Sequence, residues 1–175
     1  MIFVSVGTQL AFDRMIKAVD QWAGKRGRKD VFAQVGPTEY SARHIEAVPF
    51  ISPKDCMTKM RAADVIVAHA GMGSIIGALE LGKPILIMPR RADLGEHRND
   101  HQLATARRFA ELGKVAVAMD EHELMQRLDS LGDLGIGDRI SPFASPRLTA
   151  AVRAFIHGQP IPAQRESVRV ESVNA

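Results

Sequence analysis

Six short apolar runs alternate with segments of helical periodicity, and this alternation restricts the folds open to the chain more than any other feature. Between most runs, apolar residues recur three and four positions apart, as at Phe12, Ile16 and Val19, which is typical of amphipathic helices. Strands that are apolar throughout, separated by helices, indicate a parallel sheet covered on both faces. We therefore predict an α/β fold, a single Rossmann-like, doubly wound parallel sheet. The runs are MIFVSV, DVFAQV, EAVPFI, DVIVAH, PILIMP and KVAVAM.

The predicted domain covers residues 1–157, and residues 158–175 follow it as a flexible tail. A chain of 175 residues, 46% of them hydrophobic, can build one core but is too short for two full α/β domains. Residues 129–145 are rich in glycine and turn formers, which predicts a loop. Ser145 followed by Pro146 then predicts a helix that ends near His157.

The charge of the chain is mildly basic, with a formal net charge of +3 and a pI near 9.3. This balance falls well short of a nucleic-acid-binding arm but suits an anionic small molecule or a membrane surface. The single cysteine, Cys56, excludes an internal disulfide and fits a reducing cytoplasm. The first apolar run is too short for a signal peptide, and no stretch approaches the roughly 20 apolar residues of a membrane helix. We predict a soluble or peripheral protein.

A glycine-rich stretch, AHAGMGSIIGALELGKP at residues 68–84, follows directly on the fourth apolar run. It predicts a strand that ends at His69 and a short helix that starts at the glycines. Ligands of doubly wound sheets bind beyond the carboxyl ends of the strands, and a helix start attracts phosphate through its unpaired amides and its dipole. Gly71 and Gly73 let the backbone approach an anion. Ser74 can cap the helix or donate to the ligand, and His69 can offer an imidazole proton.

A second candidate phosphate cradle is VGTQ, residues 6–9, after the first apolar run. Both stretches are also compatible with ordinary tight turns, an interpretation that suits Gly7 and Thr8 better than the denser cluster at residues 69–74. The sequence has neither a GxGxxG fingerprint after its first strand nor a GxxxxGK[ST] phosphate loop. The pattern therefore predicts a phosphate site without identifying the nucleotide.

The stretch HAGMGSIIGALELGKP, together with EHRNDHQ downstream, resembles the donor-binding C-terminal domain of family-28, GT-B-type glycosyltransferases. The resemblance covers about residues 1–128 and begins at VSVGT. Closest in size are single-domain halves of split transferases, one eukaryotic kind acting with UDP-N-acetylglucosamine on dolichol-linked sugar and one bacterial kind adding glucuronic acid during exopolysaccharide synthesis. The resemblance implies the donor half of a GT-B fold, a UDP-sugar donor, a metal-independent inverting transfer, and a membrane-anchored partner subunit that holds a lipid-linked acceptor.

The resemblance also assigns roles to individual residues. The first glycine loop, near the reaction centre, corresponds to Gly7 and Thr8. The paired polar positions that meet the hydroxyls of the donor sugar correspond to His101 and Gln102. The diphosphate-binding turn corresponds to His69, Gly71, Gly73 and Ser74.

The chain departs from the family pattern at Gly77, where a glutamate usually binds the ribose hydroxyls. Glu80 lies three residues later on the same helix face, and helical side chains lean toward the N-terminus. If Gly77 leaves the space open, the carboxylate of Glu80 can reach the vacant position. The alternative is a solvated Glu80 near Lys83.

The loop PRRADLGEHRNDHQ, residues 89–102, follows the fifth apolar run and carries a dense set of charged side chains. Most such runs are solvated and paired among themselves, but this one lies on the rim where a ligand is expected. An arginine fork matches a carboxylate or a phosphate, and a uronic acid would supply a carboxylate beside the diphosphate. We therefore favour UDP-glucuronate as the donor. The basic residues assigned to donor binding in this loop are Arg90, Arg91, His97, Arg98 and His101.

His97 and His101 are four residues apart, as two metal ligands on a helix would be. However, HRNDH lacks the glutamate of HExxH, and the sequence offers no obvious third ligand. We predict no metal site and no cofactor, the UDP-sugar being a substrate.

Together these features predict a subunit of an inverting glycosyltransferase that moves a sugar from a UDP-sugar to a lipid-linked saccharide in exopolysaccharide or glycolipid synthesis. Negative charge grows on the leaving UDP, and fixed amides at residues 71–74 would stabilise it. No general base can be assigned, because a GT-B active site lies between two domains and this chain supplies one of those two domains. We expect a cytoplasmic protein held at the inner face of the membrane by its partner, with self-association when isolated.

The alternative is a non-catalytic nucleotide-binding or regulatory module with a degenerate donor site. Gly77 favours this alternative, whereas the clusters at residues 69–74 and 97–102 oppose it.

Overall fold

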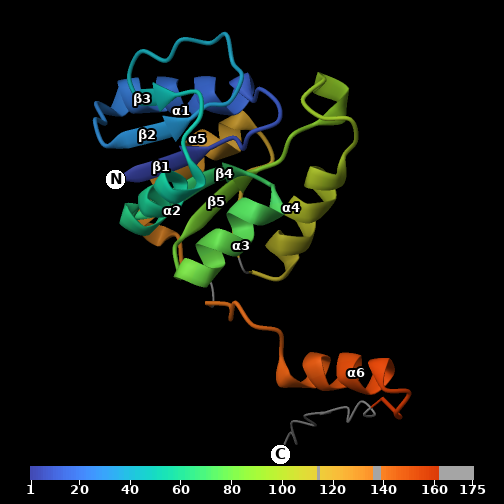
Figure 1. Cartoon of the computed structure of the whole chain (residues 1–175). Helices are drawn as coiled ribbons and strands as arrows, with labels where there is room; N and C mark the ends of the chain where they lie inside the picture. The colour runs from blue at the N-terminus through green and yellow to red at the C-terminus, as the bar shows by residue number, and fades with distance from the viewer. Residues whose placement is uncertain (114, 136–138, 162–175) are drawn as a thin grey trace, which may run out of the picture. The chain divides into compact units, whose positions relative to one another are not determined.

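Within residues 1–113, 115–135 and 139–161, which the computed structural model describes, the chain forms a six-stranded sheet in the order β3-β2-β1-β4-β5-β6 (Figure 1). All neighbouring strands are parallel. The predicted doubly wound sheet is confirmed, and each predicted apolar run contains one strand. These strands are β1 (Ile2–Ser5), β2 (Val31–Gln34), β3 (Glu46–Val48), β4 (Val65–His69), β5 (Ile85–Met88) and β6 (Ala116–Val117).

Helices cover both faces of the sheet (Figure 1). One face packs against α1 (Asp13–Arg26) and α5 (Glu121–Asp129). The other packs against α2 (Pro53–Ala62), α3 (Met72–Leu81) and α4 (His101–Glu111). Side chains along a strand alternate between the two faces, so that in β1 Val4 joins the first core and Phe3 the second. This is why the central strands β1 and β4 are apolar up to their last residues, Ser5 and His69.

Two element boundaries differ from the sequence prediction. The edge strand β3 ends at Val48, before Pro49, which has no N–H to donate to a ladder. The predicted loop at residues 129–145 contains a short 3-10 turn, η2 (Leu131–Asp133). A second such turn, η1 (Ala92–Leu94), follows β5.

The chain divides into two compact units, Met1–Ile140 and Ser141–Ala175. The second unit contains α6 (Pro146–Ile156), whose start is capped by the Ser145 side chain, as the Ser-Pro pair predicted. From residue 162 onward, the predicted flexible tail lies outside the described residues, and the domain boundary at residue 157 stays a prediction. None of the described helices is both long and apolar enough to cross a membrane.

The strand order places a switch point between β1 and β4. From β1 the chain builds outward to β2 and β3, and from β4 it builds outward in the opposite direction to β5 and β6. Connections on the two sides therefore diverge beyond Ser5 and His69, the last residues of these strands. In open α/β sheets, ligands bind in the crevice that this divergence creates.

Candidate functional site

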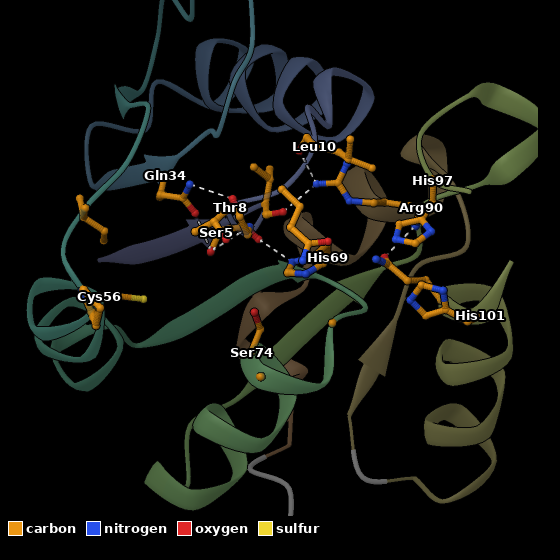
Figure 2. Close-up of a pocket in the computed structure, with 18 residues that line it drawn as sticks. Ser5, Thr8, Leu10, Gln34, Cys56, His69, Ser74, Arg90, His97 and His101 are labelled. Carbon is orange, nitrogen blue, oxygen red and sulfur yellow. Dashed lines mark hydrogen bonds between the residues drawn. The ribbon is translucent and has the colours of Figure 1, made fainter. Parts of the chain in front are cut away.

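A cavity of about 550 Å³ lies at this switch point and is lined by the loops that follow β1, β4 and β5 (Figure 2). Three residues assigned to donor binding, Glu80, Arg91 and Arg98, do not line it. The other assigned residues all do, which brings together positions far apart in the sequence. They are Gly7, Thr8, His69, Gly71, Gly73, Ser74, Arg90, His97, His101 and Gln102.

The imidazole of His69 is wedged between two glycines. A Cβ placed on Gly71 would lie 2.1 Å from Nε2 of His69, and one placed on Gly7 would lie 2.8 Å from Cε1. Gly7 also has a φ of 78°, which L-residues with a side chain rarely adopt. The two glycines are therefore required by the position of the histidine ring, and together they fix the ring at the centre of the cavity (Figure 2).

His69 is neutral at neutral pH. Burial, reinforced by the positive charge of Arg90, lowers its pKa to about 4. Its Nδ1 lies 3.5 Å from the carbonyl oxygen of Ser5, so that a proton on Nδ1 points at this carbonyl and Nε2 is left as an acceptor. Donation from Nε2 to a phosphate, the role expected from the sequence, then requires that the ring gain a second proton.

The start of α3 has no side-chain cap. Its N-cap residue is Gly71, whereas Ser52 caps α2 and Asp120 caps α5 with their side-chain oxygens. Within the described residues, no partner is found for the hydroxyl of Ser74, which lines the cavity below His69 (Figure 2). No atom lies within 4 Å of a Cβ placed on Gly73. An uncapped helix start beside open space is a ready-made anion site.

Ser5 and Gln34 hold the loop after β1 from one side, and the sequence analysis missed both. The Ser5 hydroxyl donates to Oε1 of Gln34 at 3.0 Å. Nε2 of Gln34 donates to the carbonyl oxygens of Gly7 and Pro49, each at 2.9 Å. A buried glutamine at the end of an otherwise apolar strand was the signal that could have revealed this network, because a buried amide needs partners.

Arg90 has a different role from the one expected. Its side chain is only 2% exposed and points toward the loop after β1, where it donates to backbone carbonyls (Figure 2). Its backbone N–H donates to Oε1 of Gln102 at 3.1 Å. Gln102 is itself buried, so this polar side chain orders the start of the loop as well as lining the cavity.

The other two arginines of this loop do not face the cavity. Arg91 forms an exposed ion pair with Asp93, with Nη2 2.6 Å from Oδ2. Arg98 is exposed. The expectation that these two side chains read a carboxylate of the ligand is therefore not supported by their positions.

His97 and His101 form one wall of the cavity, with their rings edge to face at 4.4 Å between centroids. Nδ1 of His97 is buried and has no hydrogen-bond partner among the described residues. Burial lowers the pKa of His97, and the neighbouring His101 and Arg90 lower it further. A buried imidazole nitrogen without a partner is costly in a folded protein and marks a place for a ligand or a water.

Among the described residues, no Asp or Glu lines the cavity, whereas the guanidinium of Arg90 and the imidazoles of His69, His97 and His101 do. A lining with one fixed positive charge and no carboxylate favours an anionic ligand. On the opposite wall, Ile51, Pro53 and Cys56 are largely apolar, and burial raises the pKa of the Cys56 thiol. The cavity therefore has a basic end and an apolar end.

The space beside Gly77 is not open. A Cβ placed on Gly77 would lie 3.1 Å from Cε of Met60, a buried side chain of α2. The methionine methyl therefore takes up part of the room that Gly77 was expected to leave, and ribose binding by Glu80 stays a prediction. Periodicity could not show this, since Met60 comes from a different helix.

Within the described residues, no group of three or more His, Cys, Asp or Glu side chains could hold a metal ion. The pair formed by His97 and His101 has no third partner of this kind there. Metal-independent binding stays a prediction.

Comparison with known proteins gives a family match over most of the chain. Residues 1–133 match the model of the glycosyltransferase family 28 C-terminal domain. The UDP-N-acetylglucosamine transferase subunit ALG13 of Homo sapiens is 27% identical over 124 residues, which cover 65% of this chain and 10% of that protein. The subunit of the same name from Saccharomyces cerevisiae is 35% identical over 66 residues, covering 35% of this chain and 31% of that protein. The chain thus spans a tenth of one relative and about a third of the other.

Solved structures share the fold at low identity. An NMR structure of ALG13 superposes with a TM-score of 0.57 at 20% identity, covering 80% of this chain and 89% of that chain. MurG of Acinetobacter baumannii gives 0.54 at 20% identity over 75% of this chain and 41% of that chain. A putative UDP-N-acetylglucosamine 2-epimerase of Listeria monocytogenes gives 0.63 at 14% identity, over 93% of this chain and 46% of that chain.

Proposed function

The chain belongs to the glycosyltransferase family 28 C-terminal domains, and on that premise we propose that it is the donor-binding half of an inverting transferase that uses a UDP-sugar without a metal. The observation that carries the proposal is the cavity itself, in which an uncapped helix start lies beside the Arg90 guanidinium and three imidazoles and, among the described residues, no carboxylate. A diphosphate supplies the negative charge that is missing from the lining of such a cavity.

The two ends of the cavity suit the two ends of a UDP-sugar. The apolar wall around Ile51 and Pro53 suits a flat base, and the start of α3 suits the diphosphate. The polar side chains of His101 and Gln102 then meet the hydroxyls of the sugar. As UDP leaves the anomeric carbon, its charge grows where the amides of α3 are already oriented, so that they stabilise it without rearranging.

We assign the acceptor side of the reaction, including the general base, to a membrane-anchored partner subunit that presents a lipid-linked saccharide. Both ALG13 relatives are named as subunits, which supports a partner. Through this partner the chain would act at the cytoplasmic face of the membrane.

An experiment on the complex tests the proposal. The chain is co-expressed with the product of a neighbouring gene, and membranes are supplied with labelled UDP-sugars. Transfer of label to lipid that requires both subunits is expected. UDP binding without transfer in the presence of the partner would instead favour a non-catalytic nucleotide-binding module.

We predict that UDP binds with unchanged affinity when a chelator removes divalent metal. Replacing Ser74 with alanine should weaken UDP by about 1.5 kcal/mol, roughly tenfold, because a hydroxyl that donates to a phosphate is lost. Isothermal titration calorimetry measures both effects, with Ser130→Ala, outside the cavity lining, as the matched control. Binding that disappears with the chelator contradicts the metal-free proposal.

We keep glucuronic acid as the proposed transferred sugar. Its carboxylate would bind to His97 and His101 instead of to the arginines of the same loop. N-acetylglucosamine, the sugar in the names of the relatives, is the competing candidate. Replacing His101 with leucine should weaken UDP-glucuronate about tenfold more than UDP-glucose, because a hydrogen bond to the charged carboxylate contributes more than one to a neutral hydroxyl. Arg91→Leu and Arg98→Leu should leave both affinities unchanged. Competition binding measures these ratios, and equal losses for both donors would remove the case for glucuronate.

A further inference from the structure

The guanidinium of Arg90 is committed to the backbone of the loop after β1. Nη2 donates to the carbonyl oxygens of Val6 at 2.7 Å and of Leu10 at 2.6 Å. Nη1 donates to the carbonyl oxygens of Ala11 and, at 3.5 Å, of Glu96. These four bonds use the four N–H groups of the two terminal nitrogens, which leaves only Nε–H for any other partner.

No carboxylate in the described part of the chain hydrogen-bonds to this guanidinium. The carboxylate of Glu96, which lies nearby, is bound by Arg14 at 2.8 and 2.9 Å and by the N–H of Arg91 at 2.9 Å. Carbonyl dipoles therefore solvate the buried charge, together with the Phe12 ring, whose centroid lies 4.8 Å from Cζ of Arg90. A charged group so deeply buried is expensive to keep without a carboxylate partner.

The loop that Arg90 holds is part of the cavity wall. Thr8, Gln9 and Leu10 line the cavity and are exposed, so packing of their side chains does little to fix the loop. Its carbonyl oxygens are held instead by Arg90 at Val6, Leu10 and Ala11, and by Gln34 at Gly7. Because these hydrogen bonds fix the carbonyl oxygens, the loop keeps a single conformation where it lines the cavity.

We propose that Arg90 is a positioning residue of the donor site, which acts by clamping the carbonyl oxygens of residues 6–11 and not by binding the ligand. Lysine cannot replace it, because one ammonium group has no planar fork and cannot reach three separate carbonyls. The neighbouring Arg91 has no such role, since it is paired with Asp93 at the surface. Where it concerns affinity for UDP, this inference rests on the proposed function.

Hydrogen exchange of the unliganded chain, followed by mass spectrometry, tests the clamp directly. In Arg90→Lys and Arg90→Met, exchange at the amides of Val6 and Gly7, whose N–H groups donate to Gln34 and Ser5, should rise by about tenfold or more, because releasing the loop carbonyls loosens the whole loop. Arg91→Met is the matched control and should change neither exchange nor UDP affinity. If Arg90→Met does not fold, Arg90→Gln, which keeps an amide donor, takes its place.

UDP titration of the same variants separates positioning from direct contact. A clamp predicts that Arg90→Lys and Arg90→Met lose UDP affinity to the same extent, about tenfold, because both release the loop. Unchanged exchange at Val6 and Gly7, with affinity kept by lysine and lost by methionine, would show a direct charge contact and overturn the inference. If wild-type protein does not bind UDP, the proposed function fails, while the exchange measurement still decides the role of Arg90.

Discussion

Replacing Gly71 with alanine should weaken UDP binding by more than about a hundredfold and lower the free energy of unfolding by about 1–3 kcal/mol. The new methyl carbon would lie 2.1 Å from Nε2 of His69 and 2.8 Å from two of its ring carbons. The ring cannot retreat, because Gly7 lies against its other side. His69 must therefore leave the cavity centre, or α3 must shift, and either movement displaces the helix start from the ligand.

Gly73→Ala provides the matched control two residues along the same helix. No atom lies within 4 Å of a Cβ at this position, so the substitution leaves the packing of the chain unchanged and stability should stay the same or rise slightly, since alanine favours a helix. UDP affinity should fall in this variant only if the ligand occupies that space.

Urea unfolding and calorimetry with UDP on the two variants separate the roles of the two glycines. Loss of both stability and binding in Gly71→Ala, with loss of binding alone in Gly73→Ala, is expected. If the Gly71→Ala protein is as stable as the wild type and binds UDP with the same affinity, the close packing of His69 between Gly7 and Gly71 has no role in binding.

The fold could be predicted because each of its parts leaves a local mark in the sequence. Strand positions buried on both faces of the sheet must be apolar, as VIVA at residues 65–68 of β4 shows, and helix starts carry local signals such as Ser52 before Pro53. The limits of β3 were harder to predict because an edge strand is held by a single neighbour. There Pro49 ends the strand although the apolar run continues.

The part of the candidate site to which one segment contributes several groups could be predicted from the sequence. The contacts between segments that lie far apart in the sequence could not. The turn at residues 69–74 contains a histidine, two glycines and a serine within six positions, so it was visible in the sequence. The burial of Arg90, by contrast, depends on carbonyl oxygens about 80 residues earlier in the chain. The same limit applies at Gly77, since Met60, the side chain nearest to a Cβ built there, comes from α2.

Acidification from neutral pH to about pH 5 should lower the free energy of unfolding by about 2 kcal/mol through His69 alone. In the folded chain the pKa of His69 is about 4, below its ordinary value of 6.5. Between these two values the unfolded chain binds the proton and the folded chain does not. Stability is therefore complete above about pH 6.5 and is lost as the pH falls toward 4.

His69→Gln isolates this contribution, because glutamine fills much of the same space and does not titrate. Urea unfolding at neutral pH and at about pH 5 should show a fall in stability in the wild type that is about 2 kcal/mol larger than in the variant. Asp20 does not interfere in this range. Although burial opposes it, hydrogen bonds from His44 and Tyr40 lower the pKa of Asp20 below 3.8, so its contribution is lost only in stronger acid. An equal pH dependence in both proteins would mean that His69 takes up a proton readily in the folded chain. It would then be able to donate to a phosphate without any help from the ligand.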